Sequence, residues 1–148
     1  MLRRLLAVVA FTIFGMTVAF AQSCPDTVKN RQALMKRSGD MAKAGVAMVR
    51  GQAPYDAAKV KEIFAAFQDK ADKLPTLFPD CSKTGNDTHA APAIWTQQDD
   101  FKAKIAKFAA DVKTAEGNTK DLDTLKVNFP LVAKDCGGCH ETFRTKMD

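Results

Sequence analysis

Residues 119–146 read TKDLDTLKVNFPLVAKDCGGCHETFRTK. Apolar and motif side chains recur along this stretch at steps of three and four residues: Leu122, Leu125, Phe129, Val132, Cys136, His140 and Phe143. This period places them on one face of a helix. Pro130 removes one backbone hydrogen bond and is expected to bend the helix near its middle. The stretch therefore predicts an amphipathic helix.

Three earlier segments have the same helical period. The first, residues 28–49, carries two adjacent apolar stripes: Val28, Met35, Ala42 and Val49, and Leu34, Met41 and Met48. The second, residues 56–74, is capped by Asp56 and followed by Pro75, and the third, residues 92–115, begins at Pro92. The linkers 51–55, 75–91 and 116–118 are mostly short, which predicts an all-α, antiparallel up-down-up-down four-helix bundle.

The apolar face of residues 28–49 contains small or polar residues where a plain bundle would carry leucine. These are Arg31, Ser38 and Gly45, with Gly39 nearby. We expect something other than side chains to fill this space, while Met41 and Met48 remain in the core.

Length and composition limit the class of protein. The chain has 148 residues, 46% of them apolar, and a formal net charge of +5. The length fits one domain, and the composition excludes a disordered chain. Lysines and arginines are spread among acidic residues along amphipathic segments rather than gathered with aromatics, so a nucleic-acid partner is not expected.

Residues 1–21 read MLRRLLAVVAFTIFGMTVAFA and have the layout of a signal peptide, with Arg3 and Arg4 before an apolar stretch and an Ala-x-Ala ending. We expect cleavage after Ala21, which leaves residues 22–148 as one exported domain with no stable membrane insertion and a net charge of +3. A retained membrane anchor is one alternative. A lipoprotein acylated at Cys24 is a weaker one.

The motif Cys136-Gly137-Gly138-Cys139-His140 has the C-x-x-C-H spacing of covalent c-type haem attachment. Two thiols can join the two haem vinyl groups, and His140 can supply a neutral imidazole to the iron. A thioredoxin-type motif would need a βαβ context. A zinc site would need a second pair of ligands, and the remaining candidates, Cys24, Cys81 and His89, do not have the spacing of metal ligands. A structural disulfide would not explain the histidine. The motif therefore predicts one covalent haem c.

The chain from the first helix to the motif resembles the cytochrome c′ family, and most of all its low-spin cytochrome c-556 type. The resemblance is carried by four ordered stretches: residues 31–36 (RQALMK), 77–79 (LFP), 94–95 (IW) and 136–144 (CGGCHETFR). It implies that Met35 lies over the distal face of the haem. In low-spin members a methionine here binds the iron, whereas in cytochrome c′ proper the iron is five-coordinate.

The resemblance leads to one expected function and one alternative. With His140 as proximal and Met35 as distal iron ligand, the protein would carry single electrons and would not be an enzyme. With a five-coordinate iron, the distal pocket would bind NO or CO. Peroxidase-type catalysis is disfavoured, because no histidine or carboxylate lies near Met35 in the first helix.

Three further residues are assigned to the haem periphery. By resemblance Arg31 pairs with a haem propionate; the alternative is a solvated arginine on the helix surface. Trp95 is expected near the macrocycle, although it would be ordinary core in any bundle. Arg144, four residues after His140 on the same predicted helix face, shields the haem edge or is a solvated C-terminal cation.

The remaining cysteines lie before the first helix and after the second. Because these two places meet at one end of an antiparallel hairpin, we predict a disulfide between Cys24 and Cys81, the alternative being two free thiols. Together these features predict a periplasmic monohaem cytochrome that docks redox proteins through an exposed haem edge and a modest basic rim. The family includes dimers, so a homodimer is left open.

Overall fold

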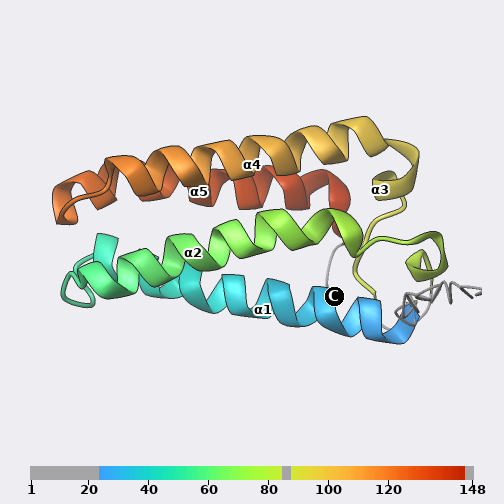
Figure 1. Cartoon of the computed structure of the whole chain (residues 1–148), viewed down its shortest axis with the longest axis horizontal. Coiled ribbons are helices and arrows are strands. Elements are labelled where there is room, and N and C mark those ends of the chain that lie inside the picture. The colour runs from blue at the N-terminus through green and yellow to red at the C-terminus, as the bar shows by residue number, and fades with distance from the viewer. Residues whose placement is uncertain (1–23, 85–87, 146–148) are drawn as a thin grey trace, which may run out of the picture.

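The computed structural model describes residues 24–84 and 88–145. Four long helices make up most of this part: α1 (Cys24–Val49), α2 (Ala57–Lys73), α4 (Gln98–Asn118) and α5 (Leu122–Phe143). They lie side by side along the long axis of the molecule (Figure 1), and α4 packs against α2 as well as α5. The predicted all-α four-helix bundle is confirmed. The predicted signal peptide, residues 1–21, lies outside the described residues.

Two of the helix starts follow directly from the sequence. The Asp56 side chain caps α2 by accepting a hydrogen bond of 3.0 Å from the amide of Lys59. Asp121 and Thr124 form a capping box at the start of α5. After α1 the chain turns at Gly51, whose φ of 70° is a conformation that glycine adopts without steric cost.

Three predicted boundaries are wrong. The first helix begins at Cys24 rather than at residue 28. The predicted third helix is two helices, α3 (Ala93–Thr96) and α4, because the backbone leaves helical geometry at Gln97, with φ −126° and ψ 50°. The last helix continues through Pro130 but ends at Phe143, after which Arg144 is extended and forms an isolated bridge with Ala90.

The long linker after α2 contains two short 3₁₀ helices, η1 (Leu74–Thr76) and η2 (Asp80–Ser82). Pro75 at the start of η1 cannot donate a backbone hydrogen bond, which suits the change of direction after α2. This linker, together with α3, lies where α1 and α4 begin and α2 and α5 end (Figure 1).

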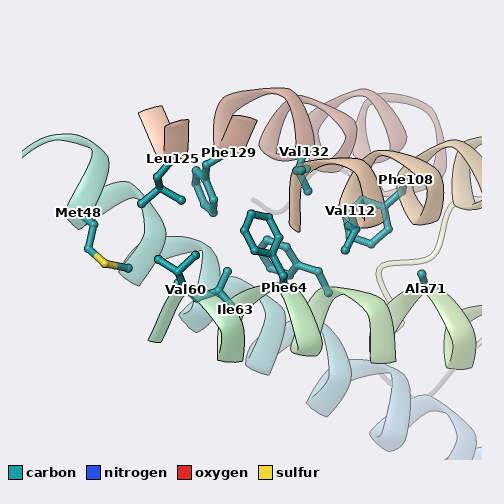
Figure 2. Packing of buried hydrophobic residues seen from close by; sticks show 12 residues of the cluster. Met48, Val60, Ile63, Phe64, Ala71, Phe108, Val112, Leu125, Phe129 and Val132 are labelled. Atoms are coloured by element: carbon teal, nitrogen blue, oxygen red, sulfur yellow. The ribbon is translucent and has the colours of Figure 1, made fainter. Parts of the chain in front are cut away.

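The core has two parts. The larger cluster begins at the end of the bundle with the short connections, which we call the closed end, and extends along the bundle as far as Ala71 in the last turn of α2; side chains from α2, α4 and α5 meet in it in Figure 2. Its buried members are Met48, Val60, Ile63, Phe64, Phe67, Ala71, Phe108, Val112, Ala115, Leu125, Phe129 and Val132. The smaller cluster marks the other half, the pocket end, and consists of Leu74, Ile94, Phe101, Ile105 and Phe143.

At the closed end, the small residue Gly45 of α1 makes room for a side chain of α5. At Gly45 the expectation of a non-protein filler is wrong, because a Cβ there would overlap the ring of Phe129, so a side chain fills the space. Met48 is buried and Met41 packs against the same cluster, as predicted.

Among the described residues, no helix is both long enough and apolar enough to cross a membrane.

Candidate functional site

A pocket of about 380 Å³ lies at the pocket end of the bundle. Its walls come from α1, the end of α2, the linker that follows, the start of α4 and the last turns of α5. The lining residues are Arg31, Gln32, Met35, Ser38, Gly39, Lys70, Leu74, Phe78, Thr88, His89, Ala90, Ile94, Phe101, Cys136, Cys139, His140, Phe143 and Arg144. The pocket thus brings together both motif cysteines, the motif histidine and Met35.

Helix α5 presents the motif to this pocket. Cys136, Cys139 and His140 stand three and four residues apart, so they share one helix face, and all three are half-buried. Both cysteines are free thiols. Burial, followed by the nearby positive charges of Arg144 and Lys70, lowers the pKa of His140 and favours the neutral imidazole that metals bind.

Helix α1 places Met35 in another wall of the pocket. Met35 is half-buried and packs against the smaller core cluster. Ser38 and Gly39, one turn further along α1, line the same pocket, and a Cβ built on Gly39 would meet no atom within 4 Å. Next to Met35, this part of the pocket wall therefore carries only small side chains.

Arg31 is buried, with only 6% of its surface exposed, so the alternative of a solvated surface arginine is wrong. Its guanidinium donates hydrogen bonds of 2.8 Å to the carbonyl of Leu77 and 2.6 Å to Thr88 Oγ1, and a longer one to Ser82. It also lies 4.5 Å from the ring centroid of Phe78. Burial lowers the pKa of Arg31, but an arginine stays protonated even when it is buried in a protein.

The two other predicted peripheral residues, Trp95 and Arg144, lie at the pocket end in different ways. Trp95 is not in the pocket wall; it donates a hydrogen bond of 3.1 Å to the carbonyl of Phe78 and contacts that ring edge-on. Arg144 lines the pocket but is not on the helix face of His140, because α5 has already ended. It is exposed at the rim.

Several lining residues were not assigned to the site from the sequence, among them Lys70, Phe78 and His89. Lys70 has a detectable signal, because it continues the apolar stripe of Ile63 and Phe67 at a helical step, where a lysine is unusual. Phe78 lies in a linker and so belongs to no helical stripe, although it is part of the LFP stretch that carries the resemblance. His89 is exposed, yet it also lines the pocket, which only the folding of the linker could show.

The predicted disulfide is present between Cys24 and Cys81, whose Cα atoms are 6.0 Å apart. It ties the start of α1 to η2. Ser82, the next residue, is fully buried and receives the longer hydrogen bond of Arg31. The disulfide thus holds the linker that bears Ser82 near the α1 wall of the pocket.

The lining fits a haem. Two free thiols and an imidazole face a mostly apolar pocket, and two buried cations, Arg31 and Lys70, line it without any carboxylate among the described lining residues. An unpaired buried cation such as Arg31 favours an anionic occupant, and a haem carries two propionates. No set of three or more His, Cys, Asp or Glu side chains in the described part of the chain is arranged to hold a bare metal ion. The fold and pocket define a helical-bundle haem protein.

Comparisons with known proteins agree with this class. The family model described as Cytochrome C′ matches residues 26–144. A cytochrome c′ of Rhodopseudomonas palustris is 39% identical over 143 residues, covering 97% of each chain, and a cytochrome c-556 of the same organism is 37% identical over 135 residues, covering 88% of this chain and 91% of the relative. The chain belongs to the cytochrome c′ family and binds one covalent haem c.

Solved structures give the same result. Cytochrome c′ from Rhodopseudomonas palustris superposes with a TM-score of 0.80 at 41% identity, covering 83% of this chain and 98% of that one. An NMR-validated model of oxidised cytochrome c556 from the same organism has a TM-score of 0.76 at 38% identity, with the same coverage. Relatives of both names therefore share this fold.

Proposed function

We propose that the protein is a periplasmic monohaem cytochrome that carries single electrons between redox proteins, with His140 and Met35 as its axial iron ligands. The observation that carries the proposal is that one pocket is lined by both motif thiols, by His140 and by Met35. Between them, these side chains supply two attachment points and two ligand atoms.

Cys136 and Cys139 would hold the haem through thioethers, and His140 would bind the iron from the same helix. When bound, the haem supplies a one-electron couple between ferric and ferrous iron. The protein would fix the group to α5, and burial lowers the pKa of the half-buried His140 imidazole, which favours the neutral form needed for ligation. Attachment through a helix keeps thiols and imidazole in one fixed register.

Met35 would supply the sixth ligand from α1. A thioether is a soft ligand that favours ferrous iron, and ligation by histidine and methionine changes little between oxidation states. Ser38 and Gly39 leave space beside Met35, which supports a close approach of the haem to α1. A coordination shell that stays the same on reduction suits electron transfer.

Arg31 would face a haem propionate. Its guanidinium is held by the carbonyl of Leu77 and by Thr88, so its position is fixed before any anion arrives. Ile94, Phe101 and Phe143, all buried, form apolar walls of the pocket. Trp95 would act indirectly by fixing Phe78, and Arg144 would lie at the exposed rim.

In this proposal the protein is a carrier rather than an enzyme. General acid–base catalysis at a haem would need a polar pair beside the iron. Among the described lining residues there is no carboxylate, and His89 is exposed.

The proposed location and partners follow from the same features. The Cys24–Cys81 disulfide supports an oxidising compartment such as the periplasm. The exposed Arg144 rim supports docking of an acidic surface on a redox protein. A homodimer is the remaining proposal on assembly, and sedimentation of the holoprotein would test it.

The test is the optical spectrum of the oxidised and reduced holoprotein, with and without CO. We expect a low-spin ferric spectrum that becomes high-spin in Met35→Ala. Met41→Ala is the matched control, because Met41 lies on the same helix but packs against the closed-end cluster. A high-spin spectrum in the unchanged protein, with ready CO binding after reduction, would contradict Met35 ligation.

That contrary result would support a second function, binding of NO or CO at a five-coordinate iron. The mostly apolar lining around Ile94, Phe101 and Phe143 favours this alternative, because it would accept a small uncharged gas. A nitric oxide complex has been solved for a variant of cytochrome c prime from Alcaligenes xylosoxidans, 28% identical with a TM-score of 0.73.

A further inference from the structure

Lys70 of α2 is a buried cation at the inner wall of the pocket. Only 7% of its surface is exposed, whereas 61% of the side chain of Lys73, one turn later on the same helix, is exposed. The Lys70 Nζ atom lies 3.8 Å from the Sγ atom of Cys136. An ammonium group therefore lies beside one of the two sulfur atoms that would carry the haem.

The charge of Lys70 is held by aromatic rings rather than by an anion. Its Nζ atom is 4.0 Å from the ring centroid of Phe108 and 5.5 Å from that of Phe67. The negative faces of these rings attract the ammonium group. Among the described residues, no carboxylate lies within salt-bridge distance of it, while Lys73 pairs with Asp69 at 2.6 Å. Burial lowers the pKa of Lys70.

We propose that Lys70 is a positioning residue that raises the reduction potential of the haem by placing a fixed, unneutralised positive charge beside the Cys136 thioether. This inference rests on the proposed haem attachment at Cys136 and Cys139 and on the proposed electron-carrier function.

The physical reason is electrostatic. Reduction adds one electron to the iron and no proton to Lys70, so a nearby positive charge stabilises the ferrous form relative to the ferric form. Inside a protein this interaction is several times stronger than in water, and salt screens it little. The electron comes from the redox protein that docks, or from dithionite in the test below.

The two buried cations, Arg31 and Lys70, differ in whether a haem propionate would neutralise their charge. Both cations line the pocket, but the propionates that would neutralise Arg31 are on a different edge of the haem from the vinyl-derived thioethers. A propionate therefore would not neutralise the ammonium group beside Cys136. Of the two buried cations, Lys70 is the one whose field is left uncompensated.

The experiment is an equilibrium redox titration of the holoprotein with dithionite and ferricyanide, in the presence of mediators. At a fixed potential we expect Lys70→Met to lower the ratio of ferrous to ferric protein about tenfold, which equals about 59 mV for one electron. Lys73→Met, which removes an exposed charge from the same helix, is expected to change the ratio less than about twofold. Raising the salt to 1 M should remove only the Lys73 effect.

A purely structural role for Lys70 would weaken both oxidation states alike and leave the ratio unchanged. An unchanged ratio in Lys70→Met, with the visible spectrum retained, would overturn the inference. If that variant loses haem or its spectrum, the same ratio measured in Lys70→Gln decides the matter. A high-spin unchanged protein would overturn the electron-carrier proposal instead, so the two failures are distinguishable.

Discussion

The closed end and the pocket end of this bundle are built from the same four long helices but in different ways. At the closed end, side chains from all four helices fill the interior, to the point that Phe129 leaves room only for a glycine at residue 45. At the pocket end, the interior contains thiols, an imidazole and the buried cations Arg31 and Lys70. Protein side chains alone fill the closed end, whereas the pocket end is built to hold the haem as well.

The largest expected effect tests whether side-chain packing at the closed end supplies most of the free energy of unfolding. Phe129 is 1% exposed at the centre of that cluster, so Phe129→Ala should lower the free energy of unfolding by about 3–5 kcal/mol and leave the visible spectrum of the holoprotein unchanged. Chemical denaturation measures the first quantity. Val127→Ala, at a site on the same helix that is 67% exposed, should change the free energy by less than about 0.5 kcal/mol. A spectral change in Phe129→Ala would show that the two ends are coupled.

An intermediate effect concerns the pocket end. Replacing both Cys24 and Cys81 by serine removes a cross-link that spans 57 residues, which should lower the free energy of unfolding by about 2–4 kcal/mol. Unfolding under non-reducing conditions measures the loss, and reduced unchanged protein should behave like the double variant. Equal stability of the oxidised protein and the double variant would contradict a stabilising role for this disulfide.

The smallest expected effect is the pH dependence of the cap at the closed end. Hydrogen bonds from the amide and side chain of Thr124 lower the pKa of Asp121 below its ordinary 3.8. The cap therefore stabilises the fold fully above that ordinary value and less as the pH falls through the lowered one. Asp121→Asn keeps a capping side chain without the charge, so its stability should fall less steeply in acid. Parallel pH curves from acid unfolding experiments would contradict this.

The sequence predicted most of the closed end and only part of the pocket end, for physical reasons. Helical period and caps such as Asp56 act locally, so the long helices could be placed from spacing alone. The C-x-x-C-H spacing is likewise local chemistry on one helix. By contrast, the burial of Arg31 depends on how the linker after α2 folds back, and no local pattern contains that information.

What the sequence could not show about individual side chains has the same origin. The indole of Trp95 donates to the carbonyl of Phe78, a long-range contact within the linker region. Lys70 was missed although its place in the apolar stripe was visible, because lysines are usually exposed and a stripe does not show which member faces a pocket. Composition and helical period can locate a site, but tertiary contacts determine which charged side chains face it.

The extended segment after α5 has a further consequence for motion. The amide of Ala91 donates to the carbonyl of Phe143 at 3.1 Å, and the amide of Thr145 donates to that of His89 at 2.9 Å. These two bonds join the end of the motif helix to the linker that lines the pocket, so the two must separate before that side can open. The rate of hydrogen exchange at the amides of Ala91 and Thr145 therefore measures how often these two bonds open, whatever the spin state of the iron.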